Sequence, residues 1–166
     1  MDVLVKLYQL PEIEPALHRV KEQNITIRKP IGPEKSVVIE WIRAREGEGW
    51  ASEAETAFLG ANRTIYIAVD ENETKADKRM VGFACYDATA KGFFGPTAVA
   101  EAYRKRGIGQ ALLLSCLFNM KLDGYGYAII GSISKTAKEF YEKCLPGSVG
   151  IEDSAPGIYR GMLVKS

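Results

Sequence analysis

Three basic residues stand beside two glycines in the segment AYRKRGIGQALL: Arg104, Lys105, Arg106, Gly107 and Gly109. The glycines let a backbone approach a ligand closely, and a helix-like apolar run begins directly after them. The first N–H groups of a helix have no partner within it, and the helix dipole adds positive potential there. The combination indicates a phosphate-binding turn. The spacing alone fits a solvated strand–turn–helix connection equally well.

Two familiar phosphate-binding motifs do not fit this segment. The dinucleotide fingerprint G-x-G-x-x-G would need a glycine where Leu112 stands, and no G-x-x-x-x-G-K-[ST] sequence occurs. The kind of ligand must therefore be inferred from the surrounding sequence.

The longer segment TAVAEAYRKRGIGQALL resembles the acyl-CoA signature of the GNAT superfamily of N-acyltransferases. That signature is an apolar strand, a short loop and a helix opening with [Q/R]-x-x-G-x-[G/A], which matches at Arg104, Gly107 and Gly109. A second, looser family motif, N-x-x-A-x-x-[L/F]-Y-E-K, matches in SKTAKEFYEK around Tyr141. Two motifs in the family's order are more specific than one, and the resemblance covers residues 25–166.

The resemblance implies a site for acyl-CoA, with acetyl-CoA as the acyl donor. The single histidine, His18, and the three separated cysteines argue against a metal site. The free edge of a strand at 97–99 would pair with the pantetheine arm, and amides of residues 105–110 would hold the pyrophosphate. Tyr141 is implied as a general acid toward the CoA sulfur, and an N–H near Val99 could donate to the thioester carbonyl. The cofactor-binding residues expected on this basis are Thr97, Ala98, Val99, Arg104, Lys105, Arg106, Gly107, Ile108, Gly109, Gln110 and Ser134.

Two positions depart from the family pattern. Ser134 stands where many relatives have an Asn that bonds the pantetheine arm, and a serine there suits a helix N-cap. Ile129 stands where relatives that acetylate protein N-termini can carry a glutamate base. A base, or a carboxylate that attracts a cationic amine, must then come from other elements or from ordered water. The candidates are Glu53, Glu55, Tyr66, Tyr86 and Asp87, with Trp50 and Tyr159 as candidates to line the acceptor cleft.

Strand and helix patterns mix along the chain and must position these residues. The elements expected are strand 2–10, helix 11–23, strand 25–30, helices 32–46 and 50–59, strands 64–70, 80–88 and 93–100, helix 107–122, strand 127–133, helix 134–145 and a closing hairpin within 148–164. The fold class that follows is α/β, and the resemblance implies a GNAT-like mixed, mostly antiparallel central sheet with splayed parallel strands and flanking helices.

Three features of this order bear on the site. Pro96 lacks an N–H and predicts a bulge or gap in strand 93–100. Helix 107–122 has few polar positions, so it should be buried on most sides, with Cys116 in the core. Because this helix connects strands 93–100 and 127–133, the two strands should be parallel neighbours.

Length and composition limit the remaining choices. With 166 residues, 46% of them hydrophobic, and a net charge of +1, we expect one domain over 1–166, with 1–23 as a β-α addition to a 25–166 core. The near-neutral charge argues against a nucleic-acid partner, and no run approaches the roughly 18 apolar residues of a membrane span. The three widely spaced cysteines suggest reduced thiols and a cytoplasmic location.

The sequence thus predicts an N-acetyltransferase that acts on a primary amine of a small molecule or a protein. The resemblance also suggests a homodimer. The alternative is a non-catalytic acyl-CoA-binding or sensing domain, which the missing strand carboxylate leaves open. Tyr141 beside an intact cofactor motif favours the enzyme.

Overall fold

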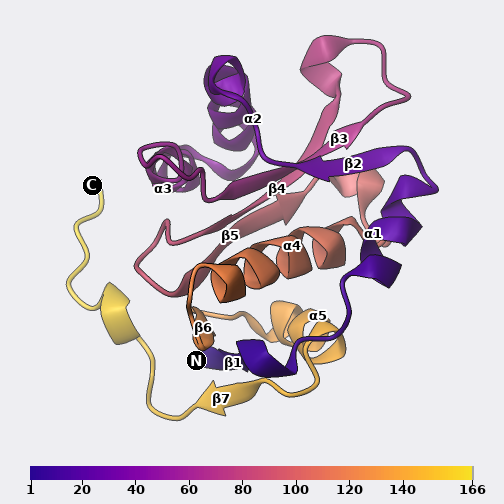
Figure 1. Ribbon diagram of the computed structural model, residues 1–166. Helices are drawn as coiled ribbons and strands as arrows, with labels where there is room; N and C mark the ends of the chain where they lie inside the picture. The colour runs from indigo at the N-terminus through magenta and orange to yellow at the C-terminus, as the bar shows by residue number, and fades with distance from the viewer. Residues whose placement is uncertain (166) are drawn as a thin grey trace.

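The structure, a computed structural model, describes residues 1–165. A seven-stranded sheet lies at its centre. The helices α4 (Ile108–Leu122) and α5 (Lys135–Cys144) pack on one face, and α2 (Lys35–Glu46) and α3 (Glu48–Thr56) pack on the other (Figure 1). Two hydrophobic cores, one on each face, hold these layers together.

The strand order is β2-β3-β4-β5-β6-β1-β7, and the sheet is mostly antiparallel. Its strands are β1 (Asp2–Lys6), β2 (Ile25–Arg28), β3 (Ile65–Asp70), β4 (Met80–Tyr86), β5 (Phe93–Val99), β6 (Tyr127–Ile130) and β7 (Val149–Ile151). The pair β5–β6 is parallel. This confirms the predicted fold class and the predicted neighbourhood of the two strands that α4 connects.

The parallel pair separates soon after it starts. Only Phe93 and Phe94 of β5 pair with β6, and the rest of β5 leaves that edge open. On its other side, β5 shifts register against β4 at Gly95 and Pro96, so two residues of β5 oppose one of β4. The bulge that Pro96 predicted is confirmed, and it lies at the point where β5 and β6 diverge.

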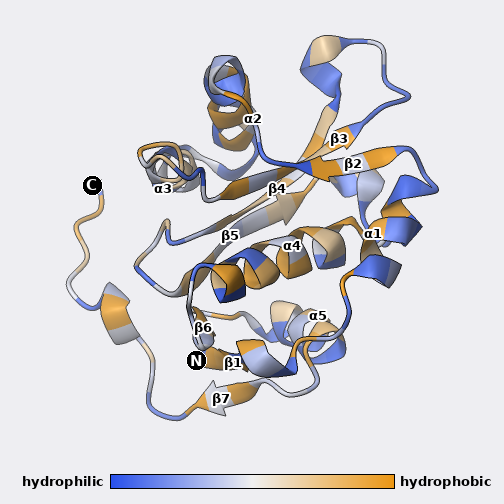
Figure 2. Cartoon of the chain, in the orientation of Figure 1, coloured by the Kyte–Doolittle hydropathy of each residue, from blue (hydrophilic) through white to orange (hydrophobic). Residues whose placement is uncertain are grey.

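The helix α4 spans the sheet from β5 toward β2 and is buried along most of its length. Ile108, Leu112, Cys116 and Met120 are almost inaccessible, as the sequence predicted. Figure 2 shows hydrophobic residues along most of α4. A helix packed this fully has a fixed position, so its N-terminus is a rigid point from which to build a site.

The N-terminal segment takes an interior position in the sheet. Strand β1 lies between β6 and β7, with Val3 opposite both Ile130 and Gly150. Val5 and Leu7 are 2% and 0% exposed. The helix α1 (Glu14–Lys21) then packs two buried residues into the same core as α4.

The predicted closing hairpin is wrong. Strand β7 pairs with β1, and residues 157–165 form no strand. The turn that would have closed the hairpin is instead fixed to β1, because the Asp2 N–H donates to Ser154 Oγ at 2.7 Å. After this turn the chain passes through a short 3-10 turn at Gly157–Tyr159 and forms no further strand within the described residues. Residue 166, the last position of the expected domain, lies outside the described residues.

The cysteines are all free and buried. None of the helices within residues 1–165 has the length and apolar character needed to cross a membrane.

Candidate functional site

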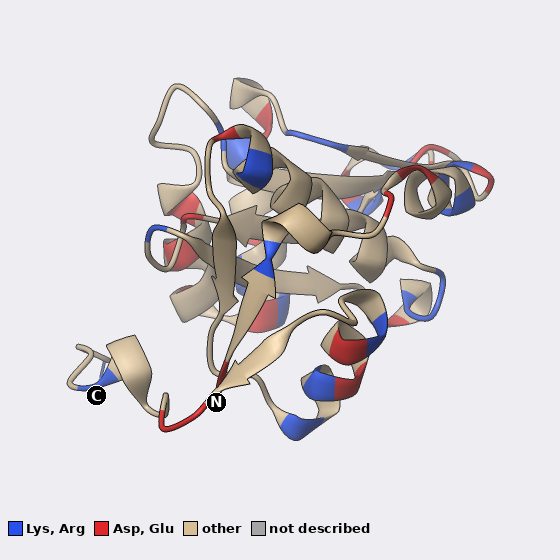
Figure 3. Ribbon diagram, turned by 60° about the horizontal axis from the view of Figure 1, so that its bottom comes forward, with Lys and Arg blue, Asp and Glu red and all other residues tan. Residues whose placement is uncertain are grey.

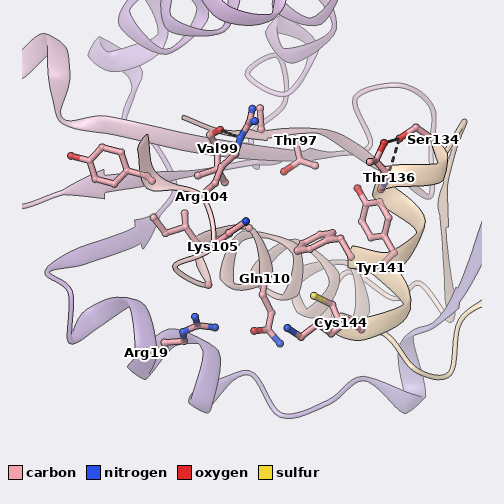
Figure 4. A pocket seen from close by; sticks show the side chains of 18 residues that line it. Arg19, Thr97, Val99, Arg104, Lys105, Gln110, Ser134, Thr136, Tyr141 and Cys144 are labelled. Carbon is pink, nitrogen blue, oxygen red and sulfur yellow. Dashed lines mark hydrogen bonds between the residues drawn. The ribbon is translucent and has the colours of Figure 1, made fainter. Parts of the chain in front are cut away.

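A cavity of about 960 Å³ lies where the open edge of β5, the start of α4 and one side of α5 meet (Figure 4). Its volume is at the upper end of the range typical of small-molecule sites. Tyr141 lines it, as do all the predicted cofactor-binding residues except Arg106: Thr97, Ala98, Val99, Arg104, Lys105, Gly107, Ile108, Gly109, Gln110 and Ser134. The structure therefore brings together residues from both sequence motifs.

The open edge of β5 presents backbone groups to this cavity. The Ala100 N–H donates to the Val81 carbonyl of β4 at 2.8 Å. Because successive residues of a strand point their backbone groups to opposite sides, the N–H and C=O of Val99 face away from β4. The Val99 carbonyl accepts a hydrogen bond from Arg104 Nε at 3.2 Å on that side, which agrees with this orientation. An extended ligand can pair with such an edge as an added strand does.

The start of α4 presents free N–H groups. Gly107 occupies the N-cap position with a φ of 86°, and no side chain caps the helix. Lys105 also has a positive φ, of 63°. The N–H groups of Ile108, Gly109 and Gln110 begin the helix and have no acceptor within it. Consecutive N–H groups in such a turn converge and form a concave anion-binding surface.

Positive side chains surround these N–H groups. The pocket is lined by Arg19, Arg104, Lys105 and Lys143, and within residues 1–165 none of the four pairs with a carboxylate. Figure 3 shows acidic and basic residues interspersed over the visible part of the molecule, so this positive charge is local. Arg106 lies outside the pocket, where its guanidinium stacks on the Tyr103 ring at 4.8 Å.

Tyr141 reaches the pocket from α5 (Figure 4). Its side chain is 8% exposed and packs edge-on against Phe94 and Phe140, at centroid distances of 6.3 and 5.1 Å. Burial raises the pKa of Tyr141 to about 12. The hydroxyl is therefore protonated at neutral pH and can act as a donor.

Ser134 caps α5. Its Oγ accepts a hydrogen bond from the Ala137 N–H at 3.2 Å and lies 3.5 Å from Thr136 Oγ1. The hydroxyl thus occupies the N-cap position that its residue type suggested, at the rim of the pocket.

Three of the candidate bases lie away from this cavity. The hydroxyls of Tyr66 and Tyr86 donate to side chains near the C-terminal end of α4, at 3.0 and 3.4 Å. Asp87 accepts hydrogen bonds from the Tyr125 hydroxyl and from the Gly92 N–H, so it holds the turn between β4 and β5. These residues support the sheet and do not line the pocket.

Glu53 lies on the opposite face of the sheet. It projects from α3 and accepts a hydrogen bond from Thr89 Oγ1. Tyr159 is close enough that the charge of Glu53, after burial, contributes to raising the pKa of the phenol. The Tyr159 hydroxyl in turn lies 2.7 Å from the position that a Cβ on Gly131 would take, just after β6. Glu53 and Tyr159 therefore lie together where β5 and β6 diverge, whereas Glu55 is exposed.

Several residues that line the pocket were not among the predicted cofactor-binding or catalytic residues. Tyr103, Ala137, Phe140 and Lys143 belong to the two matched motifs, so the sequence held a signal for them. Arg19 carried no such signal, because only the tertiary structure brings α1 to the pocket.

Comparison with known protein families identifies the family to which this sequence is similar. Residues 61–144 match the sequence model of a family described as the acetyltransferase (GNAT) domain. No curated protein matches the sequence.

Solved structures resemble the chain at low sequence identity. The glucosamine N-acetyltransferase region of a fungal multi-domain β-N-acetylglucosaminidase is 14% identical with a TM-score of 0.69, over 89% of this chain and 19% of that one. A GCN5-related N-acetyltransferase from Sphaerobacter thermophilus is 20% identical with a TM-score of 0.64, over 89% and 47%. A GNAT family acetyltransferase from Brucella melitensis in complex with acetyl-CoA is 15% identical with a TM-score of 0.50, over 71% and 82%.

The chain thus spans about a fifth of the first of these proteins and about half of the second. At these identities the likeness concerns the fold.

Proposed function

The chain belongs to the GNAT acetyltransferase family, and from this premise we propose that it transfers an acetyl group from acetyl-CoA to a primary amine of a small molecule or a protein. Family membership supports acetyl transfer in general. The observation that carries the finer proposal is that one cavity joins the open β5 edge, the start of α4 and Tyr141.

The residues of the cavity fit an acyl-CoA. The N–H and C=O of Val99 suit the amide-rich pantetheine arm, which can pair with a strand edge. The uncapped N–H groups of α4 and the positive side chains around them suit the diphosphate. When bound, acetyl-CoA supplies the activated acyl group as a thioester.

The chain's own residues then have three tasks. Pairing along β5 fixes the position of the thioester, and such orientation supplies much of the rate. The Val99 N–H on the open edge donates to the thioester carbonyl oxygen. The protonated hydroxyl of Tyr141 donates a proton to the departing sulfur. The amine gives up its proton to ordered water, which returns a proton to the Tyr141 oxygen, so that the reaction balances.

The acceptor amine approaches from the opposite face of the sheet in this proposal. The pantetheine arm of the cofactor occupies the face of the sheet that carries α4 and α5. The amine therefore enters the gap between β5 and β6 from the face that carries α3. Glu53, oriented by Thr89, attracts the cationic amine there.

We expect Glu53→Gln to raise KM for the amine severalfold while the affinity for acetyl-CoA stays the same. An unchanged amine KM would remove Glu53 from the acceptor site.

Two measurements test the proposal. Acetyl-CoA at 100 times its Kd should raise the Tm by several degrees, because ligand binding to the native state adds about 2.7 kcal/mol. The release of the CoA thiol, measured in the presence of each amine of a panel, then identifies the acceptor. Binding without thiol release from any amine would favour the non-catalytic acyl-CoA-binding domain, and no Tm shift would rule out the cofactor site.

A further inference from the structure

The helix α1 contributes a side chain to the phosphate end of the pocket. Among the lining residues that the structure describes, Arg19 alone lies outside the stretch that matches the family model, residues 61–144. The contribution of α1 is therefore a property of this chain's N-terminal segment, which the family model does not cover.

The guanidinium of Arg19 lies over the start of α4. Its Cδ, Nε and Cζ atoms are 3.0 to 3.1 Å from the position that a Cβ on Gly107 would occupy. Figure 4 shows Arg19 on the side of the pocket away from β5, whereas Arg104 lies against β5. Positive charge thus flanks the free N–H groups of α4 on two sides.

The backbone around Arg19 is tied to the phosphate-binding turn. Gln23 Nε2 donates to the Arg19 carbonyl at 3.0 Å and to the Arg106 carbonyl at 2.9 Å. Ala16 and Val20 anchor the same helix in the core that contains α4. Only the side chain of Arg19 has to become ordered when a ligand binds, which keeps the entropic cost low.

We propose that Arg19 binds the diphosphate of bound CoA, so that α1 is part of the cofactor site; this inference rests on the proposed function. A guanidinium presents several N–H donors in a plane and keeps its charge, which suits phosphate oxygens. We assign the diphosphate rather than the 3′-phosphate because the guanidinium lies on Gly107, where the N–H groups of α4 converge.

Calorimetric titration with CoA and with dephospho-CoA, which keeps the diphosphate and lacks the 3′-phosphate, tests the assignment. We expect Arg19→Ala to weaken the binding of both ligands by the same factor, roughly tenfold for a lost charge-assisted contact. Arg19→Lys should recover part of the loss. The matched control is Lys21→Ala, which removes a charge from the same helix outside the pocket and should leave both affinities unchanged.

The other outcomes separate the two proposals. Unchanged binding by Arg19→Ala would overturn the role of Arg19 while leaving the cofactor site intact. A loss confined to CoA would overturn the diphosphate assignment. If the unmodified protein bound neither ligand, the proposed function itself would fail. The Tm of each variant without ligand verifies that α1 still folds.

Discussion

At the level of single residues, burial determines what Tyr141 can do. Its ring projects from α5 and packs against Phe94. Burial of the side chain raises the pKa of Tyr141 to about 12. The hydroxyl stays protonated below that pH, so it can donate a proton over the whole range in which amines are reactive. A tyrosine at the surface would have no such margin above pH 10.

Replacing Tyr141 by Phe removes the hydroxyl and keeps the ring contacts. We expect turnover to fall about 100-fold, the usual contribution of a general acid, with little change in KM for acetyl-CoA. The unmodified enzyme should lose no activity through this residue up to about pH 10, because its titration lies near pH 12. Thiol release measured against pH tests both statements, and equal turnover in the variant would make Tyr141 a packing residue only.

Gly107→Glu should abolish the Tm shift that acetyl-CoA produces. The new side chain would place a negative charge at the N-terminus of α4, and its Cβ would come within 3.0 Å of Arg19. Gly47→Glu is the matched control, since Gly47 also has a positive φ, of 89°, and has nothing within 4 Å of its Cβ position, between α2 and α3. A normal ligand-induced shift in Gly107→Glu would place the phosphate site elsewhere.

At the level of elements, an ion pair joins β2 to the start of α2. Arg28 donates two hydrogen bonds to the Glu34 carboxylate, at 2.8 and 2.7 Å, and the Ile31 N–H donates a third at 2.8 Å. The hydrogen bond from Arg28 is the main reason that the pKa of Glu34 falls to about 2. The folded state therefore binds this proton more weakly than the unfolded chain does.

This pair should make the protein sensitive to acid. Because the folded pKa lies below the unfolded one, the stabilisation is complete above about pH 5 and is lost as the pH falls toward 2. Glu34→Gln should lower the free energy of unfolding at pH 7 by up to about 1 kcal/mol and flatten its decline in acid. Urea titrations between pH 2 and 7 measure this. Glu12→Gln, at an exposed position, is the control, and an equal acid response in both variants would contradict the assignment.

Most elements were predictable because their patterns are local. The apolar run of α4 and the bulge at Pro96 follow from residue types alone, and Gly107 with Tyr141 could be placed through the two motifs. The wrong hairpin has a tertiary cause: β7 and residues 157–165 look compatible in sequence, but β7 pairs with β1 and the turn after β7 is held to Asp2 through Ser154. Arg19 was missed for the same reason, since nothing in the sequence of α1 shows that it lies beside Gly107.

At the level of the whole molecule, β1 joins the edge strand β7 to β6, which itself pairs with β5 over only two residues. A chain that lacks residues 1–23 would leave β6 and β7 without their common partner and remove the buried side chains of Val5 and Leu7. We expect such a truncated chain to show no cooperative thermal unfolding by circular dichroism. A sharp transition near that of the intact chain would show instead that residues 24–166 fold without the N-terminal segment.

The position of β1 also has a consequence for the speed of folding. The Asp2 carboxylate accepts from the Ser132 N–H across 130 sequence positions, and its own N–H donates to Ser154 across 152. Contacts of such separation must overcome the entropy of closing a very long loop and slow the search for the native state. The meander β3–β5 has only local connections, so we expect it to assemble early. We expect the part of the sheet formed by β6, β1 and β7 to be completed last.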